Sequence, residues 1–590
     1  MTKVSMWVPS GNLPGDACAE SGGAGFARRR LVAGVVAAVV TVAALGGCRG
    51  ARAAAPPGVL SISVEKQSAW VRNFNPLAPG AGARFPTRAG VYEPLLIFNS
   101  VAGAYVPWLA TSYAWSEDHL TLRFALREAR WSDGAPFSAA DVVATFGLLR
   151  AHPALDQHDV WSFIEDVRAA SARTVELRFR RVYVPGLADV AQQPIIPAHV
   201  WRDVADPVTF ANPSPVGTGP FTEVRIFRNQ VYEIGKNPFY WQAGRPRVEA
   251  LRFLAYPANE QSNLALVEGD VDWAGDFVPS IQRTYVRRDP AHNHYWYPLL
   301  GSMVFLYANT ARAPFDDVRV RKALSMGIDR QKLVDVAMYG TTRPADATAL
   351  TDAYAAWRDP ALATRDWVAF DVAGANRLLD EAGYARGGDG LRRTHDGRPC
   401  RFDVEVVSGW SDWVRAGQVI ARELAEVGFE VKLRTYEFGA WYARLGRGAF
   451  DLSIAWSVEG PTPYGVYRAL MSSHAVRPLG EAAASNWHRF GDPAVDALLA
   501  RFEVTDDVTL ERALVAQIES RFVELAPAIP LFPNPAWGVF STRRFEGFPS
   551  AEHPYAPLSP HREPERLLVL TALAPKVEPP PGALPRGTAP

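Results

Sequence analysis

Strand-like and helix-like patterns alternate through the middle of the chain. Residues 402–407 (FDVEVV) form a short, mostly apolar run, and residues 429–436 (FEVKLRTY) alternate apolar with polar side chains, as a half-buried strand does. Between them, apolar residues recur at mostly three- and four-residue steps across 414–427, which is typical of an amphipathic helix. Residues 450–456 (FDLSIAW) are a further strand candidate. This order of strand, helix and strand predicts an α/β fold with parallel strand pairing.

Two further helices are expected from their ends as well as from their apolar positions. The first runs over 318–338, with Asp316 or Asp317 as its N-cap and Gly340 just beyond its end. The second runs over 372–383 and stops at its final glycine.

The segment 93–212 has a different pattern. It is rich in aromatic residues, and runs such as 120–126 (LTLRFAL) and 174–179 (TVELRF) alternate in the manner of strands. We expect this segment to be a mixed, more β-rich insertion between the α/β parts.

The first residues carry the pattern of an export signal. Three arginines at 28–30 precede an uncharged run over 31–47, which ends immediately before Cys48. A basic segment followed by an apolar one is typical of a signal peptide. The residues around the cysteine resemble a bacterial lipobox, so we expect Cys48 to be the lipid-attached first residue of the mature chain. A plain secretory signal is the alternative, and the adjacent arginines also permit twin-Arg export.

Composition narrows the class of function. The chain has 590 residues, with 62 Lys and Arg against 62 Asp and Glu, so its formal net charge is zero. This balance argues against a nucleic-acid partner, which requires a basic surface. The three cysteines provide neither a disulfide scaffold nor a four-cysteine zinc site.

Motifs for catalysis or cofactor binding are missing from the sequence. It contains no GxSxG, HExxH, GxxxxGK[ST] or CxxC pattern, and residues 217–220 (GTGP) lack the third glycine of a dinucleotide site. His292 and His294 would face one side of a strand, but a metal site would need a further ligand that the sequence does not identify. We therefore expect no enzyme activity, no cofactor and no resident metal. Carboxylates are numerous, so a secreted glycoside hydrolase is the distant alternative.

Several motifs, in this order, resemble the family 5 extracellular solute-binding proteins of ABC importers, of the oligopeptide-binding type. The resemblance spans residues 60–560, nearly the whole mature chain. The matching segments are 92–95 (YEPL) with 107–110 (PWLA), 126–143 with its WSDG and ADVV blocks, 215–221 (PVGTGPF), and 317–330 with its VRVRKA and IDR blocks. We expect these motif residues to shape turns and cap helices rather than to contact ligand.

The resemblance implies an α/β, two-lobed periplasmic-binding-protein fold (type II, cluster C) with an inserted third domain. Such a receptor closes on a small-molecule ligand and then docks on an ABC permease, which works with its ATPase subunits. We expect an exported monomer, lipid-anchored at the periplasmic or extracellular face of the membrane. The expected boundaries are a signal peptide at 1–47, a tether at 48–57, lobe I at 58–92, 213–302 and 527–568, the insertion at 93–212, lobe II at 303–526, and a disordered, Pro-rich tail at 569–590.

The residues that follow the strand ending at Trp456 bear on the class of ligand. Peptide binders of this family usually carry an aspartate after a late strand that ends in tryptophan. Here Trp456 is followed by Ser457, Val458 and Glu459, so only a glutamate is available as an anchor for an amino terminus.

Other segments resemble the branch of the family that binds β-linked oligosaccharides: Trp70 with 73–77 (NFNPL), 272–277 (DWAGDF) and 545–556. Sugar rings stack their C–H faces on aromatic rings, and their hydroxyls need polar partners. An oligosaccharide is therefore our first expectation. An oligopeptide is the second, and nickel complexes, opines and a sensor role are more distant alternatives. The candidate ligand-binding residues are Trp273, Asp276, Trp456, Trp410, Trp413, Trp70, Phe74, Tyr307, Glu459 and Trp537.

Overall fold

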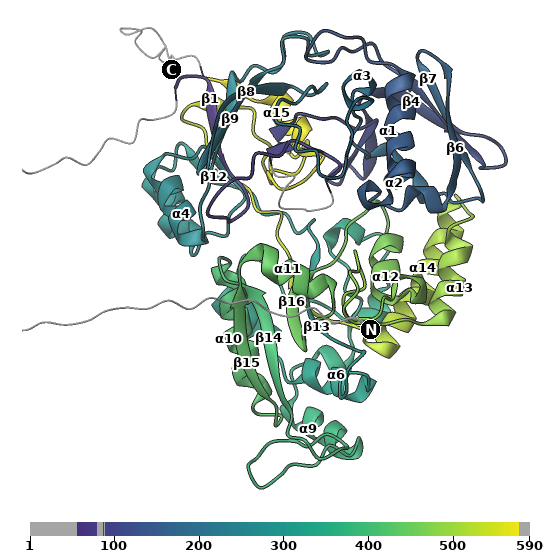
Figure 1. Cartoon of the computed structure of the whole chain (residues 1–590). Helices are drawn as coiled ribbons and strands as arrows, with labels where there is room; N and C mark the ends of the chain where they lie inside the picture. Colours follow the sequence, from purple (N-terminus) through teal and green to yellow (C-terminus); the bar gives the residue numbers. More distant parts are fainter. Residues whose placement is uncertain (1–55, 79–85, 88, 577–590) are drawn as a thin grey trace, which may run out of the picture. The chain divides into compact units, whose positions relative to one another are not determined.

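A seven-stranded mixed sheet gathers strands from both ends of the chain in this computed structural model (Figure 1). β1 is buried along its whole length and runs parallel to both of its neighbours, β10 and β11, whereas the other pairs are antiparallel. We call the part built on this sheet lobe I. Its strands, in sheet order, are β12 (Asn293–Tyr295), β18 (Val539–Ser541), β11 (Trp273–Ala274), β1 (Val59–Ser63), β10 (Ala250–Leu254), β9 (Val231–Lys236) and β8 (Phe221–Arg228).

A five-stranded sheet forms the centre of lobe II. β14 runs parallel to β15 and β16, as the strand–helix–strand pattern predicts, and α10 (Ser411–Leu424) connects β14 to β15 and packs on both (Figure 1). β13 adds antiparallel pairing with β16 and β17. The sheet order is β15 (Glu430–Tyr436), β14 (Arg401–Val407), β16 (Leu452–Trp456), β13 (Met303–Ala308) and β17 (Ile529–Pro533).

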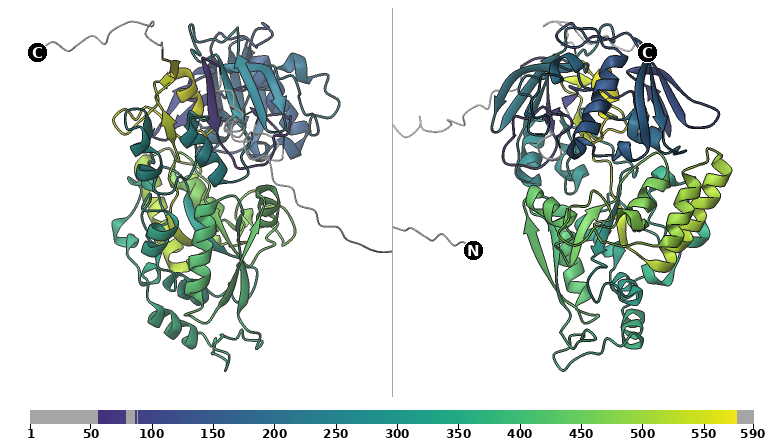
Figure 2. Two further views of the ribbon diagram at one scale, coloured as in Figure 1. Left: turned by 90° about the vertical axis from the view of Figure 1, so that its left-hand side faces the viewer. Right: turned by 45° about the vertical axis from the view of Figure 1, so that its right-hand side comes forward.

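A third, antiparallel sheet lies between β3 and β8 in the sequence. α1 (Ala139–Ala151) packs on β6 (Figure 2). Its first turn is closed by a capping box between Ser138 and Asp141. The strands expected over 120–126 and 174–179 are present as β5 and β7. The sheet order is β4 (Ala110–Trp115), β5 (Thr121–Leu126), β7 (Thr174–Phe179) and β6 (Ile164–Ser171), and β2 (Leu96–Asn99) pairs separately with β3 (Ala104–Pro107).

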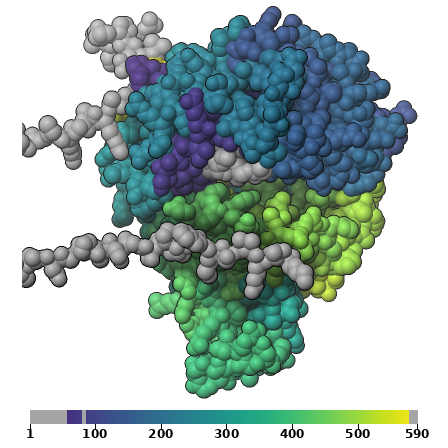
Figure 3. All heavy atoms as spheres, in the orientation of Figure 1, coloured from purple at the N-terminus to yellow at the C-terminus, as the bar shows by residue number. Residues whose placement is uncertain are grey.

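The other elements surround these sheets. The segment around α9 is exposed and forms the end of lobe II in the space-filling view (Figure 3). The remaining helices are α2 (Gly186–Ala191), α3 (Ala198–Trp201), α4 (Asn259–Glu268), α5 (Ile281–Thr284), α6 (Val318–Met326), α7 (Arg330–Lys332), α8 (Pro360–Ala363), α9 (Val372–Glu381), α11 (Phe438–Gly446), α12 (Pro463–Met471), α13 (Pro493–Phe502), α14 (Val508–Leu525) and α15 (Arg566–Ala572), and the last strand pair is β19 (Phe545–Glu546) with β20 (Ala574–Pro575).

The long helix expected over 318–338 is interrupted. Asp317 caps α6 as expected, but α6 ends at Met326, and Asp329 starts a new turn by accepting from the backbone N–H of Lys332. The buried guanidinium of Arg330 donates to the carbonyls of Ser325, Val368 and Pro530, which holds this second turn against β17. Helical periodicity alone does not reveal such a break.

Two expected boundaries differ from the structure. β17 was placed in lobe I by the boundary at 526/527, whereas it pairs with β13 in the lobe II sheet. Residues 569–575, expected in the disordered tail, are ordered: α15 continues to Ala572, and β20 pairs with β19.

The structure describes residues 56–78, 86–87 and 89–576. The expected signal peptide, Cys48, most of the tether and the last residues of the tail lie outside this range. Within the described residues, none of the helices combines the length and the apolar character needed to span a membrane.

Candidate functional site

Aromatic side chains gather where strands of the lobe II sheet end. Trp456 is the last residue of β16, and Trp410 lies three residues beyond β14; parallel pairing brings these two ends together. The ring centroids of Trp410 and Trp456 are 5.9 Å apart, and Trp413 lies 4.9 Å from Trp410. On α11, Phe438 and Tyr442 stand nearly parallel to the Trp456 ring. Together these five side chains form one continuous aromatic wall.

This wall lines a cavity of about 450 Å³, which we call the aromatic cavity. Phe277, which follows β11, and Trp537, which precedes β18, line it as well; their centroids are 5.6 Å apart. Because β11 and β18 belong to the lobe I sheet, the cavity takes its walls from both lobes. A molecule inside it would contact both.

The charged groups of the cavity are mostly paired within the protein. Lys66 forms a buried ion pair with Asp276, which lies behind the wall. Arg562 donates to Glu459 at 2.5 Å and to Glu565 at 2.8 Å. Burial lowers the pKa of Arg562, but the two glutamates outweigh this effect and raise it above its ordinary value. A ligand therefore meets few charges that lack a partner.

One buried acid and one half-buried imidazole also line the cavity. Burial raises the pKa of Asp412 to about 6, and its Oδ1 accepts a long hydrogen bond of 3.4 Å from Asn259. His561 lies 2.8 Å from the carbonyl of Gly275 through Nε2, and burial lowers its pKa, which favours the neutral imidazole.

Two amide side chains have unused hydrogen-bonding capacity toward the cavity. The Oδ1 atom of Asn534 is buried and has no partner among the described residues. Among the described residues, the side chain of Asn259 makes long contacts of 3.4 Å to Ser411 and Asp412. Buried polar atoms of this kind are normally satisfied, so a ligand hydroxyl or amide is the natural partner for them.

A comparison with protein families decides the class. Residues 104–476 match the model of the bacterial extracellular solute-binding proteins, family 5 Middle. The chain belongs to this family.

The relatives of this family 5 protein are named after different ligands. The nickel-binding periplasmic protein of Escherichia coli K12 is 27% identical over 492 residues, which cover 79% of this chain and 88% of that protein. The di/tripeptide-binding protein 2 of Pseudomonas aeruginosa is 24% identical and covers 81% and 90% of the two chains. The family and these relatives make the chain a solute-binding protein of the ABC-importer type, and the relatives are binding proteins rather than enzymes.

A solved structure supports the two-lobed fold. The mannohexaose-bound periplasmic oligopeptide-binding protein of an ABC transporter from Thermotoga maritima superposes with a TM-score of 0.81 and 23% identity, covering 89% of this chain and 99% of the other. At this identity the likeness establishes the fold of the family 5 protein, which is the α/β, two-lobed fold expected from its motifs.

Five of the ten candidate ligand-binding residues line the aromatic cavity of this family 5 protein. They are Trp410, Trp413, Trp456, Glu459 and Trp537. Glu459, the possible anchor for an amino terminus, is already paired with Arg562.

The other five candidates do not line the aromatic cavity. Trp273 is fully buried and donates from Nε1 to the carbonyl of Leu558 at 2.8 Å, and Asp276 holds Lys66 behind the cavity wall. Tyr307 is buried as well and donates its hydroxyl to the Trp456 carbonyl at 3.2 Å, so it supports the wall from behind.

Trp70 and Phe74 belong to the core of lobe I. Trp70 meets Tyr232 edge to face at 5.1 Å, and Phe74 meets Phe227 at 5.8 Å. An aromatic ring that packs in a core and one that lines a cavity cannot be distinguished by residue type alone.

Sequence reasoning missed Phe438, Tyr442, Asn259 and Asn534, and it singled out the segment 272–277 without naming Phe277 as a ligand contact. The first two were detectable, because they lie one helical turn apart directly after β15, where aromatic residues face the same end of the sheet. The two asparagines had no recognisable motif around them.

No metal centre emerges from the described part of the chain, where no three His, Cys, Asp or Glu side chains come together in a way that could hold an ion. His292 approaches Asp289 at 2.9 Å, while the His294 ring is tilted against that of Phe540 with their centroids 5.3 Å apart, so the two histidines have separate partners.

Proposed function

We propose that this protein captures an oligosaccharide between its two lobes and presents it to the permease of an ABC importer. The observation that carries the proposal is the aromatic wall of Trp410, Trp413 and Trp456, combined with paired charges and open amide groups. Flat apolar surfaces suit the C–H faces of sugar rings, and Asn259 with Asn534 suits their hydroxyls.

The mechanism is a shift between open and closed populations. Lobe II supplies Trp410, Trp413 and Trp456, and lobe I supplies Phe277, Trp537 and Asn259, so a ligand gains all its contacts only when the lobes are closed. A ligand can shift this equilibrium only by as much as it prefers the closed state. The closed form is the one that we expect the permease to recognise.

The mannohexaose bound to the Thermotoga relative supports a sugar ligand. Peptide-binding relatives support the second candidate, an oligopeptide. A further support for the sugar is that Glu459, the candidate anchor for an amino terminus, is paired with Arg562 at 2.5 Å.

We further propose that the protein acts as a monomer tethered to the outer face of the membrane through a lipid on Cys48. A freely closing receptor needs both lobes unobstructed, which favours the monomer. Replacing Cys48 with alanine should release the protein from the membrane fraction of expressing cells, and retention of this variant in that fraction would contradict the anchor.

The ligand is tested by thermal-shift screening with cello-, manno-, xylo- and laminari-oligosaccharides beside di- to pentapeptides. A ligand at about 100 times its dissociation constant adds about 2.7 kcal/mol to the free energy of unfolding, which raises the melting temperature measurably. We expect a shift with at least one saccharide series. A shift with peptides alone would overturn the sugar proposal.

The aromatic wall is tested by Trp456→Ala. We expect its affinity for the sugar, measured by calorimetry, to fall by at least about tenfold. Trp115→Ala is the matched control, because Trp115 is also half-buried but packs on Phe179, away from the cavity. Its affinity should stay within about twofold of the wild type.

A further inference from the structure

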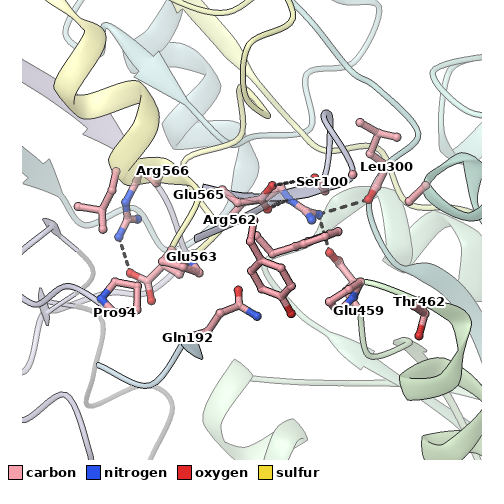
Figure 4. A pocket seen from close by; sticks show the side chains of 18 of the residues that line it. Pro94, Ser100, Gln192, Leu300, Glu459, Thr462, Arg562, Glu563, Glu565 and Arg566 are labelled. Atoms are coloured by element: carbon pink, nitrogen blue, oxygen red, sulfur yellow. Dashed lines mark hydrogen bonds and ion pairs between the residues drawn. The ribbon is translucent and has the colours of Figure 1, made fainter. Parts of the chain in front are cut away.

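A second and larger cavity adjoins the aromatic cavity. It measures about 750 Å³, which lies within the usual range for ligand sites. Three parts of the chain line most of it: the segments around β2 and the end of α2, residues 353–357 and 459–462 of lobe II, and the residues from Arg562 to Leu567 (Figure 4). We call it the distal cavity.

A single ion pair separates the two cavities. Arg562 and Glu459 line both of them, and the guanidinium of Arg562 donates to Glu459 across the junction (Figure 4). Glu459 comes from the loop after β16, and Arg562 comes from the segment before α15. The side chain of Glu459 is 38% exposed and that of Arg562 is 14% exposed, so the junction is formed by these two side chains.

The distal cavity offers the same kinds of contact as the aromatic cavity. Tyr354, Trp357 and Tyr105 contribute aromatic rings. Ser100 and Gln192 contribute polar groups; the Ser100 hydroxyl is buried with no hydrogen-bond partner among the described residues, and the Gln192 amide reaches into the cavity (Figure 4).

Its charges do not favour an anionic ligand. The arginines are paired within the protein, Arg566 with Glu563 at 2.5 Å and Arg562 with Glu459 and Glu565. Glu511 adds a further carboxyl group, whose pKa is raised by burial. An uncharged, hydroxyl-rich chain would meet aromatic and hydrogen-bonding surfaces there without having to neutralise a charge.

We propose that the distal cavity is a second compartment of the binding site, which takes the far end of an elongated neutral solute. The near end stacks on the aromatic wall, and the chain passes the Arg562–Glu459 pair at the junction. The chemical class of the ligand in this inference rests on the proposed function. The existence of the second compartment does not.

The test blocks the distal cavity and measures binding as a function of ligand length. Gln192→Trp fills the cavity from the end of α2, and Ala353→Phe fills it from lobe II. Gln418→Trp adds the same ring at an exposed position on α10 that lines neither cavity. Dissociation constants for saccharides of two to six rings are measured by calorimetry on the full chain.

We expect the two filling variants to bind the longest saccharides at least about tenfold more weakly, and the shortest within about twofold of the wild type. The Gln418→Trp control should match the wild type at every length. Equal losses at all lengths, or no loss for the longest ligand, would overturn the second compartment.

The same comparison separates this inference from the proposed function. If the wild type binds alanine peptides and no saccharide, the sugar class is wrong for both cavities. The length dependence of peptide binding in the filling variants then still decides whether the distal cavity holds ligand.

Discussion

Glu93 shows how one buried residue makes stability depend on pH. Its carboxylate is fully buried and accepts hydrogen bonds from the Trp108 and Trp241 indoles and from the Tyr240 hydroxyl. Burial raises the pKa of Glu93 to about 7, despite these donors. An unfolded glutamate titrates near pH 4.3. Between this pH and about 7, Glu93 therefore keeps its proton in the folded state but has lost it in the unfolded state.

The free energy of unfolding should therefore fall as pH rises from about 4.5 to 7 and level off above that range. Glu93→Gln removes this titration, so we expect its slope in this range to be shallower by up to about 1.4 kcal/mol per pH unit. Urea denaturation at a series of pH values measures it. The exposed Glu117→Gln variant is the control, and an unchanged slope in Glu93→Gln would show that other acids, such as Glu519, dominate.

Residue type alone did not separate ligand-facing rings from packing rings. Trp456 ends the short strand β16, and Trp273 belongs to the short strand β11. Trp456 lines the aromatic cavity, whereas Trp273 is fully buried and donates its indole N–H to the carbonyl of Leu558. Strand position is the more useful guide, because Trp410 follows β14 and Trp456 ends β16, and the parallel pairing of these strands brings the two rings to 5.9 Å. Contacts between distant segments, such as Lys66 with Asp276, carry no local pattern.

At the scale of elements, the GTGP motif allows its loop to pack closely against the backbone of Gly90 and Val91. A Cβ atom added to Gly217 would lie 1.9 Å from the Val91 carbonyl oxygen, and one added to Gly219 would lie 1.9 Å from that of Gly90. The loop is fixed by the Gly219 N–H, which donates to Val91 at 3.0 Å. This explains why the motif identifies the fold while contacting neither cavity through these two glycines.

Gly219→Ala should accordingly destabilise the protein by more than about 4 kcal/mol or prevent folding, because the clash is with backbone. Gly147→Ala is the matched control: Gly147 lies inside α1 with nothing within 4 Å of an added Cβ, and alanine should stabilise the helix by about 0.5–1 kcal/mol. Melting temperatures and urea midpoints measure both. A soluble Gly219→Ala variant with wild-type stability would refute this role of the loop.

The periodicity of the chain predicted the α/β units well, since β14, α10 and β15 lie within a few residues of their expected bounds. It failed where side chains from elsewhere set the ends. The helix expected over 318–338 is interrupted near Arg330, whose guanidinium is taken up by carbonyls of β17 and two other segments. Lobe membership of β17 likewise depends on pairing between residues far apart in sequence.

At the scale of the whole molecule, an ion pair between the lobes shifts the equilibrium between the open and closed states toward the closed state. The Arg562–Glu459 pair joins the segment before α15 to the loop after β16, so it forms only when these parts approach each other. A partly exposed pair of this kind contributes up to about 1 kcal/mol. That energy changes the ratio of closed to open molecules by about fivefold.

Glu459→Gln should therefore shift the ligand-free protein toward the open state, and added salt should shift the wild type in the same direction. Single-molecule FRET between dyes on the exposed positions Leu264 and Val336, one on each lobe, reports this equilibrium. The control is Asp403→Asn, which removes a similarly exposed partner of Arg434 within lobe II alone. Arg562 keeps Glu565 in Glu459→Gln, so the fold is not at risk. An unchanged FRET distribution in this variant would mean that the pair only separates the two cavities and does not hold the lobes together.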